Sequence, residues 1–167
     1  MDIQIRKMTE ADWPQVARIY GQGINTKMAT FQNVIPSYEE WDQGHLAVGR
    51  LVAVSNEQIA GWVALSATSA REVFSGVAEV SIYIDEGYRG QGIGKQLMEK
   101  LFHISEEAGV WCIESRVFDD NIPSLKLHET CGFRTVGIRE KIGYDQKINQ
   151  WRSIVLLERR SQSVGLD

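Results

Sequence analysis

One stretch of this chain, residues 78–101, limits the possible folds more than any other. It begins with an apolar, β-branched run, continues through a polar turn, and ends in an amphipathic helix; the turn carries glycine at alternate positions, Gly90, Gly92 and Gly94. The first turn of a helix has backbone N–H groups without an internal partner, and the helix dipole favours negative charge there. The stretch therefore predicts a strand, a glycine turn and a helix N-terminus that together bind a phosphorylated ligand.

The spacing of the glycines argues against two common phosphate-binding motifs. A dinucleotide fingerprint that began at Gly90 would need its third glycine at Lys95. A Walker loop would need glycine at Arg89 and Ser or Thr at Gln96. A glycine-rich turn that merely ends a strand is the alternative interpretation of the glycines alone.

Composition bounds the kind of protein. A chain of 167 residues with 43% hydrophobic residues has the size of one globular domain, expected over residues 1–160 with a C-terminal tail at 161–167. A net charge of -4 without a basic run argues against a nucleic-acid partner. The N-terminus lacks the pattern of a signal peptide, and the longest uncharged stretch is too short and too polar to span a membrane, so a cytoplasmic protein is expected.

The two cysteines, Cys112 and Cys131, fit no metal-ligand pattern. In a reducing compartment they are expected to be free structural thiols. Neither has a sequence cue for activation as a nucleophile, so the sequence argues against a covalent intermediate on cysteine.

Apolar periodicity and turn residues predict an α/β or α+β domain with a mixed sheet. Gly21 and Gly23 are expected to loosen the end of the first helix. Strands are expected near residues 3–5, 51–54, 59–65, 78–84, 111–117, 132–138 and 153–157, and helices are expected to begin near Thr9, Ser37, the glycine turn and Pro123, giving the order β-α-α-β-β-β-α-β-α-β-β.

Residues 89–94 resemble the Arg/Gln-x-x-Gly-x-Gly/Ala signature of the GNAT superfamily of N-acetyltransferases, in which this loop wraps the pyrophosphate of acetyl-CoA. Glycine lets the main chain approach phosphates without an intervening Cβ. The resemblance implies a single GNAT-type domain with a mixed, mostly antiparallel central sheet flanked by helices. It also implies acetyl-CoA as the co-substrate.

Within the superfamily, the chain resembles the phosphinothricin and methionine sulfoximine acetyltransferases. The matching elements are Arg71, residues 78–84, residues 121–124, residues 127–129 and residues 131–133. The segment between Tyr144 and Trp151 is longer than the family's G-Y-K-x-G-x-W-x-D pattern, Ser153 replaces its Asp, and Gly21 stands where Asn is common. The longer segment is expected to reshape a wall of the acceptor pocket or the closing hairpin.

The resemblance carries the expected cofactor contacts onto three parts of the chain, with no metal among them. These contacts are Arg89, Gly90, Gln91, Gly92, Ile93, Gly94 and Lys95 in the loop, the main chain of Ile82, Tyr83 and Ile84, and the side chains of Asn121 and Ser124. Backbone N–H groups of the strand are also the expected donors to the acetyl oxygen. Asn121 and Ser124 have an equally good interpretation as helix caps.

Glu79 is the candidate general base. Only a neutral amine attacks a thioester, and an amine with a pKa of about 10.4 is almost entirely protonated near neutral pH. Strand alternation groups Glu79 with Ser81 and Tyr83 on one face of the strand. Because an unpaired glutamate is costly to bury, Glu79 is expected to be either the base or a carboxylate paired with an arginine.

His128 stands where many GNAT enzymes carry a tyrosine. The resemblance makes it a catalytic candidate, as the acid that protonates the CoA thiolate or as a partner of Glu79. A histidine that packs or caps within a helix is the alternative.

Arg71 is the candidate for holding the acceptor, since a guanidinium can clamp a carboxylate through two parallel bonds. Thr30 and Phe31 are expected to line the same pocket, although Arg71 could be an exposed residue and Phe31 part of the core. The expected partner is a small, amino-acid-like amine. Alternatives are a peptide N-terminus, a polyamine, an aminoglycoside, or a catalytically silent CoA sensor; a homodimer is implied by family analogy.

Overall fold

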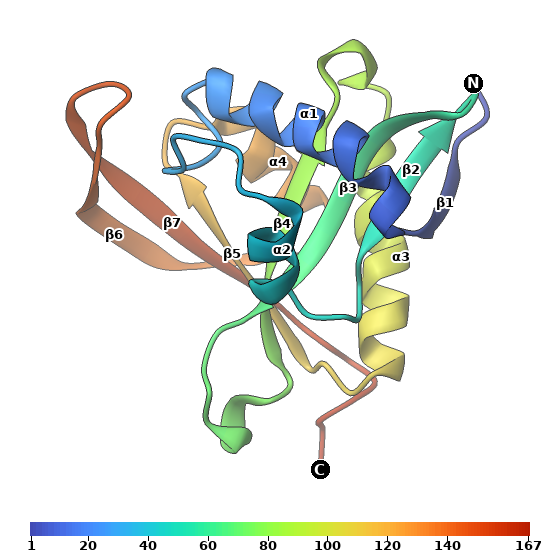
Figure 1. The fold of residues 1–167 in the computed structure, drawn as a ribbon. Coiled ribbons are helices and arrows are strands. Elements are labelled where there is room, and N and C mark those ends of the chain that lie inside the picture. Colours follow the sequence, from blue (N-terminus) through green and yellow to red (C-terminus); the bar gives the residue numbers. More distant parts are fainter.

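The computed structural model describes residues 1–167 as a twisted sheet with helices on both faces (Figure 1). The strands lie in the order β1-β2-β3-β4-β5-β7-β6, and all neighbours are antiparallel except β4 and β5. The elements are β1 (Gln4–Lys7), α1 (Trp13–Asn25), α2 (Tyr38–Gln43), β2 (Leu51–Ser55), β3 (Gln58–Ala67), β4 (Val77–Ile84), α3 (Ile93–Glu107), β5 (Cys112–Phe118), α4 (Ile122–Thr130), β6 (Arg134–Asp145) and β7 (Gln150–Arg160). The predicted order of helices and strands, and the mixed, mostly antiparallel sheet, are confirmed.

Alternation along the strands supplies one hydrophobic core on each face of the sheet. On β3, Trp62 packs in the cluster that contains α1 and α2, whereas Val63 and Leu65 pack in the cluster that contains α3. All three side chains are buried. The sheet is therefore the middle of three layers, and neither of its central faces is left to solvent.

Turn and cap residues hold the helices as the sequence predicts. The Ser37 hydroxyl accepts the Glu40 N–H at the start of α2 (3.2 Å), and Gly109 follows α3 in the left-handed conformation, at φ +84°. Thr9, where the first helix is expected to begin, forms a capping box with Asp12, but around a short 3-10 turn that precedes α1.

The expectation that Gly21 and Gly23 loosen the end of the first helix is wrong, because α1 continues to Asn25. A Cβ at Gly23 would lie 2.5 Å from Cε1 of Tyr83. The glycine therefore allows close packing of α1 against β4.

The last two strands are longer than their apolar patterns indicate. Only part of β7, around Val155 and Leu157, packs in the core, while the outer parts of β6 and β7 form an arm that extends past the sheet (Figure 1). The predicted strands stop near the residues that pack in the core, whereas the β6–β7 ladder continues along the arm as far as Asp145 and Gln150. The tail at 161–167 has no helix or strand, yet its first residue, Ser161, is buried and donates to Glu106 (3.0 Å).

None of the helices combines the length and the apolar character that crossing a membrane requires.

Candidate active site

The two central strands separate in the middle of the sheet. β4 and β5 pair in parallel only over Val77–Glu79 and Cys112–Glu114. Beyond these residues β5 continues beside β7, while β4 continues beside β3 as far as Ile84. The edge of β4 that faces β5 is therefore open from Val80 onward.

A cavity of about 1120 Å³ occupies this separation and is bordered by α1, segment 26–32, β4, β5, α4 and the start of α3. It brings together nearly all the predicted site residues: Glu79, His128, Ile82, Tyr83, Ile84, Arg89, Gly90, Gly92, Ile93, Gly94, Lys95, Asn121, Ser124, Thr30 and Phe31. Arg71 and Gln91 do not line it.

The glycine turn forms one end of the cavity. Gly90 and Gly92 have φ of +74° and +79°, and a Cβ at either would meet no atom within 4 Å. The first helical hydrogen bond runs from the Gln96 N–H to the Gly92 carbonyl (3.2 Å). The backbone N–H groups of residues 89–95 have no acceptor within the protein. A row of free donors beside a side-chain-free surface at a helix N-terminus fits a diphosphate.

Glu79 lies where the strands part, and it has a partner. Its Oε2 accepts a hydrogen bond from Nη1 of Arg116 on β5 (2.9 Å), and Arg116 also lies 3.7 Å from Glu114. The Glu79 side chain is 30% exposed, so it is open to the cavity while it is paired. The arginine partner that the sequence left open as the alternative for Glu79 is therefore present, and the same side chain also lines the cavity.

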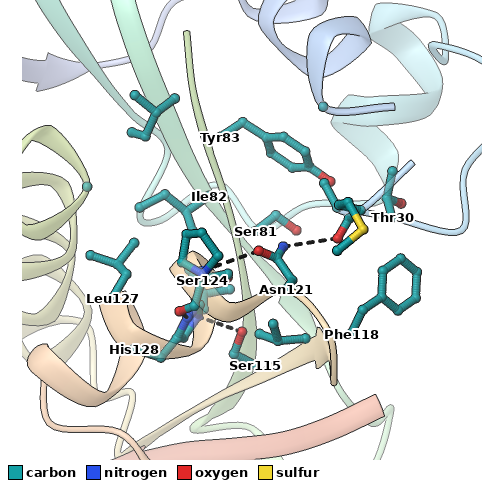
Figure 2. Close-up of a pocket in the computed structure, with 18 of the residues that line it drawn as sticks. Thr30, Ser81, Ile82, Tyr83, Ser115, Phe118, Asn121, Ser124, Leu127 and His128 are labelled. Carbon is teal, nitrogen blue, oxygen red and sulfur yellow. Dashed lines mark hydrogen bonds between the residues drawn. The ribbon is translucent and has the colours of Figure 1, made fainter. Parts of the chain in front are cut away.

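His128 is buried and forms a hydrogen bond through each ring nitrogen (Figure 2). Nδ1 lies 2.7 Å from the Ser124 carbonyl, which only an N–H can satisfy, so Nε2 accepts from the Ser115 hydroxyl (2.8 Å). Burial lowers the pKa of His128, and the bond to Ser124 opposes this only in part. His128 is therefore a neutral imidazole near pH 7, and its partner is Ser115 rather than Glu79.

Aromatic side chains line the opposite end of the cavity from the glycine turn. Tyr83 stacks on Tyr20 and Trp62, at ring-centroid separations of 5.0 and 4.9 Å, and Phe31 meets Phe118 edge to face at 4.9 Å. Burial raises the pKa of the Tyr83 phenol, so it is a neutral hydroxyl. Tyr83 points toward Thr30 in Figure 2.

Arg71 lies away from the cavity of its own chain. It is exposed in the loop between β3 and β4, with its guanidinium 5.8 Å from the centroid of the Phe74 ring. That loop begins after the last pair of the β3–β4 ladder, Ala67 with Ala78, and projects from the end of the sheet opposite α1 and α4 (Figure 1). The guanidinium that does line the cavity is that of Arg116.

The sequence did not single out several residues that the fold brings to the cavity. Ser115 and Arg116 lie in the strand expected near residues 111–117, and Tyr20 lies in the helix expected to begin near Thr9. The one available signal was an arginine inside an apolar strand, since such a residue is costly to bury unpaired.

Burial raises the pKa of both thiols, Cys112 and Cys131. Neither lines the cavity. No cluster of three or more His, Cys, Asp or Glu side chains is arranged to hold a metal ion.

The central strands part, the glycine turn has free donors, and a carboxylate lies between them. Together these features define an acyltransferase that uses an acyl-CoA. Residues 8–133 match the Acetyltransferase (GNAT) family, and the chain belongs to that family. Its relatives include proteins named as N-acetyltransferases.

Individual relatives and a solved structure agree with this family assignment. The chain is 34% identical over 155 residues to YwnH of Bacillus subtilis (86% of this chain, 95% of YwnH). It is 29% identical over 165 residues to the phosphinothricin N-acetyltransferase of Alcaligenes faecalis, in an alignment that covers 93% of this chain and 81% of that relative. A crystal structure of a GNAT superfamily phosphinothricin acetyltransferase from Sinorhizobium meliloti in complex with acetyl-CoA shares the fold, with a TM-score of 0.84 at 23% identity (100% and 97% covered).

Proposed function

We propose that this acetyl-CoA-dependent N-acetyltransferase acts on the amino group of a small, amino-acid-like acceptor of the phosphinothricin or methionine sulfoximine type. The observation that carries the proposal is the Glu79–Arg116 pair, 2.9 Å apart at the wall of the cavity. A molecule with both an ammonium and a carboxylate group matches this pair with opposite charges. The relative from Alcaligenes faecalis, named for phosphinothricin, supports the same class of acceptor.

Each part of the cavity has a distinct task in the proposal. Bound acetyl-CoA supplies the acetyl group as a thioester. The free N–H groups of residues 89–95 hold its diphosphate, and the open edge of β4 holds its arm and polarises the acetyl carbonyl. Asn121 and Ser124 contact the same arm at the start of α4.

Glu79 takes the proton from the acceptor amine, directly or through water, and Arg116 binds the acceptor's carboxylate. Ser115 lies next to His128, and its hydroxyl can turn from Nε2 to donate a hydrogen bond that stabilises the leaving thiolate while the hydroxyl keeps its own proton. The proton that Glu79 removes from the amine then reaches the thiolate through water. Since the thiolate has a pKa of about 8.5, it needs only a modest donor. His128 therefore acts by orienting Ser115.

The test is release of CoA thiol from acetyl-CoA across a panel of amines. The panel contains methionine sulfoximine, phosphinothricin, common amino acids and their carboxamides, polyamines, an aminoglycoside and a peptide with a free N-terminus. Turnover of free amino acids well above that of the matching carboxamides supports the proposal, and Arg116→Gln should remove this preference. Preference for a polyamine, aminoglycoside or peptide would refute the proposed acceptor, and CoA binding without turnover of any amine would indicate the silent sensor.

Glu79→Gln tests the base. General base catalysis contributes about 10²–10⁴-fold, so kcat should fall by that order while the affinity for acetyl-CoA is nearly kept. Glu114→Gln is the matched control, because Glu114 lies 3.7 Å from the same arginine but does not line the cavity. Equal turnover of the two variants would show that the base is assigned to the wrong residue.

A homodimer also belongs to the proposal. The arm of β6 and β7 exposes large apolar side chains that nothing in one chain covers: Val136, Ile138, Ile142, Tyr144 and Trp151. Sedimentation velocity at micromolar concentration would distinguish a dimer from a monomer.

A further inference from the structure

One wall of the cavity has no regular structure of its own. Segment 26–33 contains neither helix nor strand, yet its residues Thr26 and 28–32 line the cavity beside Tyr83. A segment without a backbone ladder takes its position from the groups that satisfy its carbonyls and N–H groups. In this protein many of those groups come from the far end of the chain.

Lys147, in the turn between β6 and β7, holds the segment most directly. Its Nζ donates to the carbonyls of Thr30 (2.9 Å) and Gln32 (3.0 Å) and pairs with Asp145 (3.1 Å). An ammonium group has three N–H donors, and here each has an acceptor. The side chain is 12% exposed, so this is not a solvated surface lysine.

Asp145 and Arg152 form ion pairs next to the contact between Lys147 and segment 26–33. The Asp145 side chain is fully buried and accepts from Arg152 (3.1 Å) and from Lys147. Burial alone would raise the pKa of Asp145, but the hydrogen bonds from Arg152 and Lys147 outweigh it and hold the pKa below its usual range. Arg152 also donates to the Lys27 carbonyl, which ties the start of the segment to β7.

The packing beside these ion pairs is close. Gly143 faces Phe31 so tightly that a Cβ there would lie 2.5 Å from Cζ of the ring. The guanidinium of Arg152 lies 3.6 Å from the centroid of Phe118, which itself contacts Phe31 edge to face. Phe31 therefore packs both against β6, at Gly143, and against Phe118.

None of the three charged residues lines the cavity. Lys147 instead binds the carbonyls of Thr30 and Gln32, two residues that do line the cavity. We propose that Lys147 is a positioning residue: by fixing residues 30–32 from outside the cavity, it determines which acceptors fit. The inference rests on the proposed function, and it gives a role to the turn at which the sequence departs from its family's pattern.

The test compares Lys147→Met with Lys141→Met, a matched control on the exposed face of β6 whose ammonium has no partner. Lys147→Met should raise KM for the preferred acceptor by about tenfold and narrow the discrimination between a small and a large acceptor. KM for acetyl-CoA should change by less than about twofold, because the glycine turn is untouched. Both Michaelis constants rising together, or neither changing, would overturn the proposal.

Hydrogen exchange gives a readout that does not depend on turnover. Amides in peptides covering residues 26–33 should exchange faster in Lys147→Met, while those covering 89–101 should not; unchanged exchange in 26–33 would refute the role of Lys147. If Lys147→Met fails to fold, the same kinetic and exchange measurements are made on Lys147→Arg. This variant keeps a cation beside Asp145 but replaces a tetrahedral set of donors with a planar fork. A wild-type protein that acetylates no amine would refute the proposed function and leave the exchange result to judge this inference.

Discussion

A methyl group added to the glycine turn tests the anion site most sharply, because the structure separates its effect on folding from its effect on binding. Gly92 precedes α3 with φ +79°, and a Cβ there would meet no protein atom within 4 Å. The folding cost of Gly92→Ala therefore comes from left-handed backbone strain alone, about 1–2 kcal/mol. For a domain of this size, each kcal/mol lowers Tm by about 2–4 °C.

Gly109→Ala is the matched control. Gly109 has nearly the same conformation, φ +84°, and the same open surroundings, but it lies after the other end of α3 and outside the cavity. The two variants should lose similar stability in thermal unfolding. Any difference between them in cofactor affinity is then not a consequence of strain.

Only Gly92→Ala should weaken binding of the cofactor. Its methyl group projects into the surface on which the diphosphate would lie. It therefore separates the phosphate oxygens from the backbone N–H groups of residues 92–95. A lost hydrogen bond to a charged group costs about 1.5–3 kcal/mol, or about tenfold to a hundredfold in Kd. Titration calorimetry with CoA measures it. Wild-type affinity in Gly92→Ala, or an equal loss in Gly109→Ala, would refute the assignment of the turn as the diphosphate site.

Two further predictions concern residues around the cavity. Because burial lowers the folded-state pKa of His128, the unfolded chain binds more protons, and stability should fall as pH drops below about 6.5, the unfolded-state value. In His128→Gln the decline of Tm between about pH 7 and 5 should be shallower than in His103→Gln, an exposed control, and equal slopes would contradict the buried neutral state. In Gly23→Ala the new Cβ meets the Tyr83 ring at 2.5 Å, so stability should fall by about 1–3 kcal/mol with a higher KM for the acceptor. Gly137→Ala, where a Cβ meets nothing within 4 Å, should show neither change in the same melting and kinetic assays.

Local chemistry made the cofactor end of the site predictable from the sequence. The glycine spacing, the apolar strand before it and the helix after it are contiguous, and each constrains the others over short range. The strand face that carries Glu79 followed from alternation, and the structure places Val80 in the core with α3 and Tyr83 against the opposite cluster.

The partner of Glu79 was not predictable, because it depends on tertiary pairing. Arg116 reaches Glu79 only because β5 lies parallel to β4 for three residue pairs and then leaves it. No pattern within β5 indicates which strand will be its neighbour, so an arginine in this strand signals that it needs a partner but not which partner it has. Arg71 is close to Glu79 in sequence and a guanidinium suits a carboxylate, but the loop that carries Arg71 projects away from the cavity.

The acceptor end of the cavity is harder still to predict from the sequence, because its shape depends on ion pairs between distant segments. Lys147 and Thr30 are far apart in sequence and meet through a side chain and a carbonyl, a contact that neither periodicity nor motif spacing encodes. Removing the Lys147 ammonium would leave the buried Asp145 carboxylate with Arg152 as its one cation, so the contact depends on both charged partners. Relatives with the same glycine turn but a different β6–β7 turn would therefore be expected to bind the same cofactor and differ in acceptor.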